Sequence, residues 1–381
     1  MNTNLRSGIA ALGCLAALTA IAACGADTSA KAGQSAVQPG SADQQAAVAA
    51  AKAEYDKWSK VQPALKVEPL PAKPAAGATL TIIGCPIPAC KTTTDSAAEA
   101  AKLLGWKVTY LQSELTPKSF LSLMSQAAQD PPNFLAYVAI LPNSAISQQL
   151  ATLQAAGTKM STLAPLEDPK PAGPVQAVVA GSAQYGIGGQ IMGSTVVADA
   201  NGPADTVFVW DPTYKLQAQP ERDEFAKVVT AAGGKVDTLD VNLLEAGKSV
   251  PTQIVSYVQS HPNVKYVVFL FEDYAAGVPQ ALAAAGLTNK VKIVDNHPTT
   301  GSLQNLVDGT KFASIGSEID ALGYRWVDQF ARLQQNVPLS AETANPPGWH
   351  QVFVKGNVQD PTKNPDPVGW RDAYLKAWRV S

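Results

Sequence analysis

The sequence predicts an α/β protein with two doubly wound parallel sheets that face each other across a cleft. From Thr79 onward, short apolar runs typical of strands alternate with helical segments of about 10 to 16 residues. Strands that alternate with helices form parallel sheets covered on both faces. About eleven or twelve strands are expected, too many for one sheet in a chain of this length. Right-handed crossovers place the loops after the strands at one edge of each sheet, where α/β proteins bind ligands.

The N-terminus has the features of an export signal. Ile9 to Ala23 form an apolar run of about 15 residues after Arg6. This is the length of a signal-peptide core and is shorter than the roughly 20 residues that span a bilayer. The run ends in IAAC, the pattern of a bacterial lipobox. We therefore expect residues 1–23 to be a lipoprotein signal peptide and Cys24 to carry a lipid that anchors the chain to the cell membrane, outside the cytoplasm. The alternative is an ordinary signal peptide that is cut nearby, with no role for Cys24.

The next segments lead to the α/β body. Residues 24–45 are rich in Ala, Ser, Gly and Gln and are expected to form a flexible tether. Residues 46–60 read as a helix that carries Tyr55 and Trp58 on one face and can dock on the body. Four prolines between residues 63 and 74 predict an extended connector, which completes the segment 46–78.

The first half of the body contains five expected strands. Three helices are expected between them. The capping-box spacing of Ser96 and Glu99 indicates the first, and Thr116-Pro117 indicates the start of the second. Asn143 can cap the third, which ends at Gly157. The expected strands cover residues 79–84, 106–111, 134–141, 160–164 and 175–180.

The second half repeats the alternation. Helices are expected at 185–200, 217–232, 252–260, 274–285, 303–307, 321–335 and 370–378. Strands are expected at 206–211, 235–241, 264–271, 291–295, 312–315 and 351–354.

Composition and motifs argue against several function classes. The formal net charge is −2 and no long basic block occurs, so nucleic-acid binding has no electrostatic support. Residues 186–191 fail the dinucleotide fingerprint at its last position, and their glycines read as turn and packing residues. The three histidines are far apart in sequence, and no nucleophile elbow occurs. We therefore expect no cofactor and no metal. An enzyme built from scattered cleft residues is the least favoured alternative.

Two cysteines remain in the body, in the sequence CPIPAC from Cys85 to Cys90. Outside the cytoplasm a disulfide is the default for such a pair. Free thiols, or a redox or metal site, are the alternatives, but four intervening residues do not suit a redox motif and no further ligand lies nearby in sequence.

Residues from Thr79 to about Asn336 resemble the type I periplasmic binding proteins of the ribose and galactose kind, which serve bacterial importers. The segment FEDYAAGVPQALAAAG (271–286) is similar to the family's N-D-x-x-A-x-G … A-L-x-x-A-G segment. Residues 293–309 are similar to its G-F-D-G … I-x-x-G segment, and ERDEF (221–225) to its R-x-x-G-F segment. The order and spacing of the three segments also agree with the family.

The resemblance implies two lobes joined by three hinge crossovers, with a small solute enclosed when the lobes close. It implies an N-terminal lobe of residues 79–183 plus 296–322. The C-terminal lobe is then expected to contain residues 184–295 plus 323–381.

The resemblance also suggests the ligand-binding residues. Asp295 falls on the family's aspartate that bonds solute hydroxyls, and Arg222 falls on its arginine. Asp273 matches an aspartate that follows a binding asparagine, which Glu272 replaces here. Trp210, Tyr214 and Trp349 are possible aromatic platforms. The full candidate set is Arg222, Asp295, Glu272, Asp273, Tyr185, Asn143, Asp211, Thr93, Thr94, Tyr274, Ser317 and Glu318.

These observations favour a lipid-anchored solute-binding protein that does no chemistry of its own. We expect a monomer that captures a small polar ligand, such as a sugar, a polyol or a related hydroxylated or cationic solute. Its partners are then the membrane permease and the ATPase of an ABC importer. A ligand-binding receptor for a sensor or signalling system is the alternative.

Overall fold

The computed structural model describes residues 40–170 and 173–380. The expected signal peptide, the lipidated Cys24 and most of the expected tether lie outside the described residues. The end of the expected tether is helical, because α1 (Ala42–Trp58) begins after a capping box made by Ser41 and Gln44. Within the described ranges, no helix is both long enough and apolar enough to cross a membrane.

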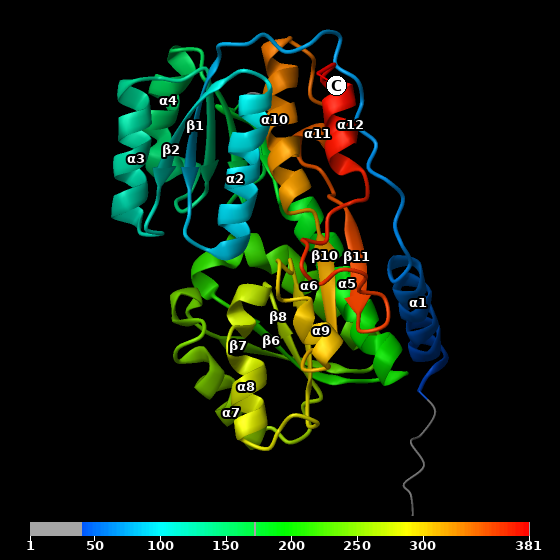
Figure 1. The fold of residues 1–381 in the computed structure, drawn as a ribbon. Helices are drawn as coiled ribbons and strands as arrows, with labels where there is room; N and C mark the ends of the chain where they lie inside the picture. The colour runs from blue at the N-terminus through cyan, green and yellow to red at the C-terminus, as the bar shows by residue number, and fades with distance from the viewer. Residues whose placement is uncertain (1–39, 171–172, 381) are drawn as a thin grey trace, which may run out of the picture. The chain divides into compact units, whose positions relative to one another are not determined.

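The first sheet has five parallel strands in the order β2-β1-β3-β4-β5. Figure 1 shows helices beside this sheet, among them α2, α3 and α4. The strands are β1 (Thr79–Gly84), β2 (Lys107–Gln112), β3 (Phe134–Val138), β4 (Lys159–Leu163) and β5 (Val175–Val179). The connecting helices are α2 (Pro88–Leu103), α3 (Pro117–Gln129), the 3-10 turn η1 (Asn143–Ile146) and α4 (Ser147–Ala155).

The second sheet has six strands in the order β11-β10-β9-β8-β6-β7. All neighbours run parallel except β10 and β11, which are antiparallel. Its strands are β6 (Asp205–Trp210), β7 (Lys235–Asp240), β8 (Tyr266–Phe269), β9 (Lys292–Asn296), β10 (Ala313–Ser317) and β11 (His350–Val354). Its segments between strands include α5 (Ser182–Ala200), η2 (Pro212–Tyr214), α6 (Lys215–Ala231), η3 (Leu243–Glu245), α7 (Val250–Ser260), η4 (Glu272–Ala275), α8 (Val278–Ala284) and α9 (Gln304–Asp308).

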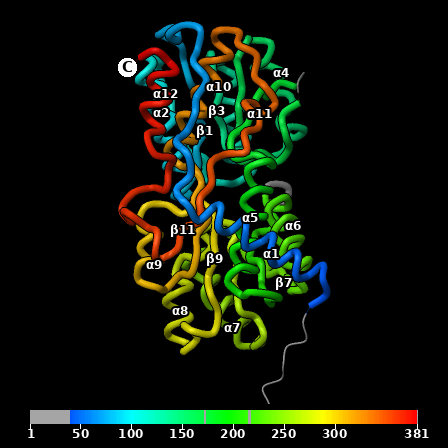
Figure 2. The backbone as a smooth tube through the Cα atoms, turned by 90° about the vertical axis from the view of Figure 1, so that its right-hand side faces the viewer, coloured from blue at the N-terminus to red at the C-terminus, as the bar shows by residue number. Residues whose placement is uncertain are grey.

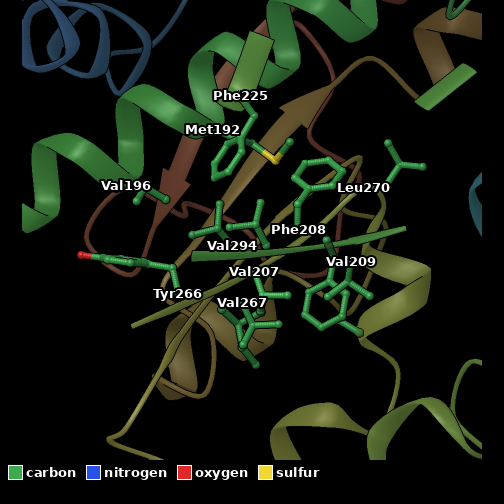
Figure 3. Packing of buried hydrophobic residues seen from close by; sticks show 14 of the residues in the cluster. Met192, Val196, Val207, Phe208, Val209, Phe225, Tyr266, Val267, Leu270 and Val294 are labelled. Atoms are coloured by element: carbon green, nitrogen blue, oxygen red, sulfur yellow. The ribbon is translucent and has the colours of Figure 1, made fainter. Parts of the chain in front are cut away.

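The core of the second sheet is built from both of its faces. Phe208 of β6 packs against Phe225 of α6, with ring centroids 5.4 Å apart. Figure 3 shows these rings beside Met192 of α5 and Val294 of β9. All four side chains are fully buried. Burial of such large apolar groups is the dominant favourable term in folding.

The glycines at the start of α5 are packing residues, as the sequence predicts. A Cβ on Gly189 would lie 2.0 Å from the Glu221 carbonyl oxygen, and one on Gly188 would lie 2.6 Å from Asn296 Nδ2. These glycines let α5 approach α6 and the end of β9 closely.

The chain passes repeatedly between the two sheets. Between β5 and β11, the passages are at residues 180–181, at 318–319, and at 345–349 after α10 (Asp320–Gln334) and α11 (Ala341–Ala344). They correspond to the expected three hinge crossovers. A fourth passage leads from β11 to α12 (Trp370–Ala377), which packs on α10.

The expected division of the late segments between the lobes differs from the structure. Strand β10, expected in the first lobe, pairs with β9 in the six-stranded sheet. Helix α10, expected from residue 323 onward in the second lobe, packs on α2, β4 and β5. The reason is visible in its side chains: Trp326 is fully buried and its Nε1 donates a hydrogen bond to Ser161 of β4 over 2.9 Å. Helix α12 follows α10, since Trp378 stacks on Tyr324 at 5.4 Å.

Most expected elements occur within a few residues of their predicted bounds. Helix α2 is an exception, because it begins at Pro88 rather than at Ser96. Ser96 is not a cap; it is buried inside the helix and donates to the Asp320 carbonyl over 2.7 Å. The helix expected at 274–285 is divided into η4 and α8, with Gly277 at φ 75° between them.

The N-terminal segment follows both sheets. Tyr55 and Trp58 of α1 pack against the core of the six-stranded sheet, in agreement with the expected docking face. Residues 59–78, which we call the strap, then run beside the second and first sheets in turn (Figures 1 and 2). Asn357 donates to the Ser59 carbonyl over 3.0 Å, and Leu70 donates to the Ala377 carbonyl over 2.9 Å.

Candidate functional site

A cavity of about 100 Å³ lies where the loop edges of the two sheets face each other. Both sheets contribute because parallel strands bring all their carboxyl ends to one edge. The described residues that line it are Cys85, Ile87, Ala89, Cys90, Thr93, Leu115, Val138, Ala139, Ile140, Leu163, Ala164, Ala180, Tyr185, Tyr214, Leu243, Phe271, Asp273, His297, Ile319 and Leu322. We call this cavity the cleft pocket.

The five-stranded sheet supplies an aliphatic wall, which we call the first wall. Cys85 directly follows β1, and Leu115 lies beyond the end of β2. Val138 and Leu163 end β3 and β4, and Ala180 follows β5. The end of each strand therefore contributes at least one residue to the lining.

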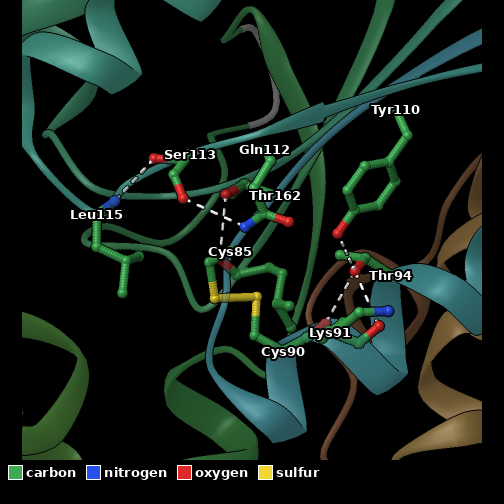
Figure 4. Close-up of a disulfide and its surroundings, with 10 residues drawn as sticks. Cys85, Cys90, Lys91, Thr94, Tyr110, Gln112, Ser113, Leu115 and Thr162 are labelled. Atoms are coloured by element: carbon green, nitrogen blue, oxygen red, sulfur yellow. Dashed lines mark hydrogen bonds between the residues drawn. A yellow bond between two sulfur atoms is a disulfide. The ribbon is translucent and has the colours of Figure 1, made fainter. Parts of the chain in front are cut away.

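A disulfide between Cys85 and Cys90 forms part of the first wall, in agreement with the expected pairing. Figure 4 shows it beside Leu115 and near the first turns of α2. The Thr94 hydroxyl donates to the Cys90 carbonyl over 3.0 Å and is 2.9 Å from the Tyr110 hydroxyl of β2. The start of α2 is thus tied to both β1 and β2, which fixes the position of this wall.

The six-stranded sheet supplies an aromatic wall with polar groups, which we call the second wall. Tyr185, from the first turn of α5, lies against it. The centroid of the His297 ring is 5.8 Å from that of Tyr185 and 5.3 Å from that of Phe271, and both pairs meet edge to face. Tyr185 and Phe271 are 5.9 Å apart. Such edge-to-face pairs are favoured by the ring quadrupoles.

His297 presents one free ring nitrogen in this wall. Its Nδ1 is hydrogen-bonded to the Ser317 hydroxyl, while its buried Nε2 has no hydrogen-bond partner among the described residues. Burial lowers the pKa of His297 to about 3, with a smaller contribution from His350. The ring is therefore neutral at physiological pH. Its Nε2 donates or accepts a hydrogen bond according to the tautomer that Ser317 selects.

Asp273 brings a carboxyl group to the same side of the pocket. Burial, together with the smaller effects of the nearby Glu272 and Asp295, raises the pKa of Asp273 to about 7. Asp273 lies in η4, directly after β8, and His297 directly follows β9. Because β8 and β9 are paired neighbours, the two groups emerge side by side from the edge of the sheet.

The backbone around the pocket adopts conformations that are rare for residues with a side chain. Leu115, Ala164, Ala180 and His297 have φ values of 58°, 51°, 49° and 55°. All four line the pocket. Left-handed backbone at non-glycine residues costs free energy and concentrates at functional sites. This supports the pocket as the working part of the molecule.

Behind the second wall lies a buried ionic cluster around Lys311. The Lys311 ammonium is 2.5 Å from Asp295 and 3.9 Å from Glu272, and all three side chains are buried. Ser314 donates to Asp295, and the Thr299 amide donates to Glu272 over 2.8 Å. Burial raises the pKa of Glu272, against the opposing effect of Lys311. These carboxylates are engaged within the protein. Glu272, Asp273 and Lys311 also border a second, more open cavity of about 470 Å³ beside α8 and α9.

Arg222 does not reach the cleft pocket. Its guanidinium lies 4.6 Å from the Trp210 ring centroid and pairs with the exposed Asp223. Glu318 is fully buried and receives two hydrogen bonds from Arg325, at 3.0 and 2.8 Å. Both charges therefore have partners outside the cavity.

Four other candidates have structural contacts away from the pocket lining. Asp211 accepts from the amides of Thr213 and Leu243, each over 2.9 Å. Asn143 accepts from the Tyr137 hydroxyl over 3.3 Å. Tyr274 is fully buried behind Phe271, and Ser317 holds the ring of His297.

The structure thus brings Thr93, Tyr185 and Asp273 of the twelve candidates to the cleft pocket, together with Tyr214 from the proposed aromatic platforms. The Thr93 hydroxyl is already used, because it donates to the Ile319 carbonyl over 3.1 Å. Sequence reasoning missed His297, Phe271 and the aliphatic lining. The position of His297, two residues beyond Asp295 at a strand end, is the one signal that identifies it.

Comparison with known proteins gives a consistent result. The family described as periplasmic binding protein domain matches residues 87–336. No curated protein matches the chain. A glucose-galactose binding protein from Geobacillus stearothermophilus superposes with a TM-score of 0.63 at 15% identity, covering 74% of this chain and 99% of that one.

Two further solved structures show the same likeness. The 5-methylthioribose transporter solute-binding protein from Thermotoga lettingae gives a TM-score of 0.66 at 13% identity, covering 80% of this chain and 93% of that one. An ABC transporter solute-binding protein from Mycobacterium smegmatis with bound glycerol gives a TM-score of 0.64 at 18% identity, covering 77% of this chain and 100% of that one. At these identities the likeness shows the fold.

Proposed function

This chain belongs to the periplasmic binding protein family, and we propose that it captures a small solute in the cleft pocket and delivers it to an ABC importer. Its family and fold are those of type I solute-binding proteins, which act outside the cytoplasm and are not enzymes. The observation that carries the proposal is the pocket itself. It lies between the loop edges of two sheets, and the chain passes between those sheets several times. Closure about such passages excludes water and strengthens polar contacts inside.

The ligand of the proposed site contacts Thr93, Tyr185 and Asp273, the three sequence candidates that line the pocket. Glu272 and Asp295 support the second wall through Lys311 rather than by direct contact. The structural neighbours were solved with sugars or polyols or are described as binding them. Hydroxylated solutes are therefore the first class to test.

We also propose the lipid anchor, on the sequence of the N-terminus alone. The lipobox predicts acylation of Cys24. A Cys24→Ala variant expressed with its signal is expected to lose incorporated radiolabelled palmitate and to leave the membrane fraction. Unchanged labelling and membrane retention would remove this part of the proposal.

A solute screen tests the binding role. The thermal midpoint of the full chain is measured with galactose, arabinose, glycerol, cyclic alcohols, amines and nucleosides. A ligand at a hundredfold excess over its Kd stabilises the folded state by about 2.7 kcal/mol. Leu163→Trp fills the pocket and is expected to abolish the shift, whereas Leu103→Trp, on a side chain that is 42% exposed, is the matched control.

Uptake of the radiolabelled hit then tests delivery. A deletion strain is expected to lose uptake, to recover it with the wild-type gene, and not to recover it with Leu163→Trp. Uptake that does not depend on the gene, or chemical conversion of the hit by the purified protein, would contradict the proposed function.

A further inference from the structure

The cleft pocket differs from a site built for a sugar ring in how few polar groups it offers. Its polar side chains are Thr93, Tyr185, Tyr214, Asp273 and His297, and the rest of the described lining is apolar. A hydroxyl that is buried without a hydrogen-bond partner is strongly unfavourable. A molecule with a hydroxyl on every carbon therefore finds too few side-chain partners in this lining.

The charged ligand candidates Arg222, Glu318 and Asp295 have partners outside the pocket. Arg222 pairs with Asp223, Arg325 with Glu318, and Lys311 with Asp295. Among the described residues lining the pocket, none carries a positive charge, because the one histidine is neutral. An anionic ligand would have no counter-charge in the pocket.

The available hydrogen-bonding atoms lie on one side. Asp273 and the free Nε2 of His297 come from neighbouring strand ends, and Tyr185 packs against the same histidine. The opposite side consists of Val138, Leu163 and the disulfide. The pocket is thus divided into a polar end and an apolar body.

The size of the pocket limits the ligand further. Its volume of about 100 Å³ is somewhat smaller than the roughly 150 Å³ apolar cavity that holds benzene in an engineered protein. One carbon ring, or a short branched chain, fills it in the arrangement seen here.

We propose that the ligand of this pocket is a small neutral molecule with an apolar body of about one carbon ring and a single alcohol or phenol head. This inference rests on the proposed function and narrows its ligand class. The ring packs against the first wall, and the hydroxyl bonds with Asp273 and His297. A hydroxyl both donates and accepts, so it matches either tautomer of His297. An amine is excluded from the proposal because its charge would be desolvated by the aliphatic wall with one carboxyl as its counter-charge.

The test compares two ligands that share a ring. Cyclohexanol and myo-inositol both have a six-membered carbon ring, with one hydroxyl in the first and six in the second. Binding of each to the full chain is measured by saturation-transfer NMR and calorimetry. We expect cyclohexanol to bind about thirtyfold more tightly than myo-inositol, because the additional hydroxyls lack partners.

Two wall variants locate the binding. Val138→Thr keeps the shape of the wall and adds one hydroxyl, whereas Ile140→Thr adds one hydroxyl and also removes one carbon atom. Each is expected to weaken cyclohexanol binding about fivefold, and Val368→Thr, at a side chain that is 70% exposed, is the control that leaves it unchanged. Circular dichroism establishes that each variant is folded. If one wall variant fails to fold, the other alone is enough to test whether the ligand contacts this wall.

The outcomes separate the ligand class from the transport role. Tighter binding of myo-inositol, galactose or cyclohexylamine than of cyclohexanol would overturn the inference. If that binding is lost in Leu163→Trp, the solute-binding role still stands. Cyclohexanol binding that is insensitive to both wall variants would also overturn the inference. If no solute binds at all, both the inference and the proposed function fail.

Discussion

The two walls of the cleft pocket are built from equivalent positions in two similar sheets, yet they have different chemistry. In the five-stranded sheet the strand ends carry Cys85, Val138, Leu163 and Ala180, which offer no free hydrogen-bonding group to the pocket. In the six-stranded sheet, β8 and β9 lead to Asp273 and His297. The first wall is held by a covalent link and the second by an ionic cluster.

This difference shows how one fold can place the groups that set the shape of a pocket on one wall and the polar groups on the other. In the proposed site, the first wall limits the size of the apolar group that fits, and the second limits the number of hydrogen bonds to the ligand. The polar wall needs internal charge compensation, since its carboxylates are buried. The aliphatic wall does not.

The largest effect is expected when that compensation is removed. Lys311→Met leaves Asp295 and Glu272 buried without their cation, which costs about 3–5 kcal/mol of the free energy of unfolding. Urea denaturation at pH 7 measures this loss. Lys363→Met, in an exposed pair with Asp360, is the matched control and is expected to change stability by less than about 0.5 kcal/mol. Equal effects of the two variants would show that the cluster does not support the second wall.

An intermediate effect is expected from the covalent link of the first wall. The double variant Cys85→Ser, Cys90→Ser opens a ring with a sequence separation of 5. In the chain-entropy description, a loop this short contributes about 2 kcal/mol. Urea denaturation with and without a reductant measures it: the reductant is expected to destabilise the wild type and to leave the double variant unchanged. A reductant effect on the double variant would mean that the link is not its target.

A pH-dependent effect, which disappears at low pH, is expected from Asp273. Burial raises the pKa of Asp273 to about 7, so the folded state binds this proton more tightly than the unfolded chain does. The free energy of unfolding of the wild type therefore falls as the pH rises from about 4 to 7. Asp273→Asn removes that loss, so its free energy of unfolding relative to the wild type is expected to rise by about 1.4 kcal/mol per pH unit over this range. Parallel stability curves for the two proteins across this range would contradict the raised pKa.

The smallest effect is expected at Arg222, where the family resemblance and the geometry disagree. The guanidinium stacks on Trp210 and pairs with exposed Asp223, so Arg222→Ala is expected to change the Kd of a pocket ligand less than about twofold. Calorimetry of the variant decides between the binding role that the resemblance implies and the position outside the pocket that the geometry gives. A loss of binding would return the arginine to the site and would contradict a pocket whose described lining has no positive charge.

The fold could be read from the sequence because its signals are local. Apolar runs, Thr116-Pro117 and the glycines that end helices each act within a few residues, and the structure has elements at these places. The start of α2 was missed because Ser96 has the sequence spacing of a cap but bonds to Asp320, 224 residues away. The placement of β10 and α10 also depends on distant partners, which no local pattern contains.

The site was only partly predictable for the same reason. The sequence located the edge of the sheets at which the cleft pocket lies, and therefore two of its lining residues, Asp273 and Tyr185. It could not show that Lys311 engages Asp295, since that pairing is made only in the folded chain. The aliphatic first wall was overlooked because Val138 and Leu163 at strand ends are indistinguishable from core residues. His297 depends on a left-handed backbone that the sequence does not reveal.

The strap has a mechanical consequence. It is fastened to the six-stranded side through the Ser59 carbonyl and to the five-stranded side through Leu70 and Glu68. The Gln62 amide adds a further fastening to the six-stranded side, since it donates to Gln351 of β11 over 3.2 Å, so residues 63–67 join the two sets of fastenings. Separation of the two sheets at the cleft pocket must stretch that short stretch or break one of these hydrogen bonds. The strap therefore limits how far the cleft can open, and the length of this linker sets the limit.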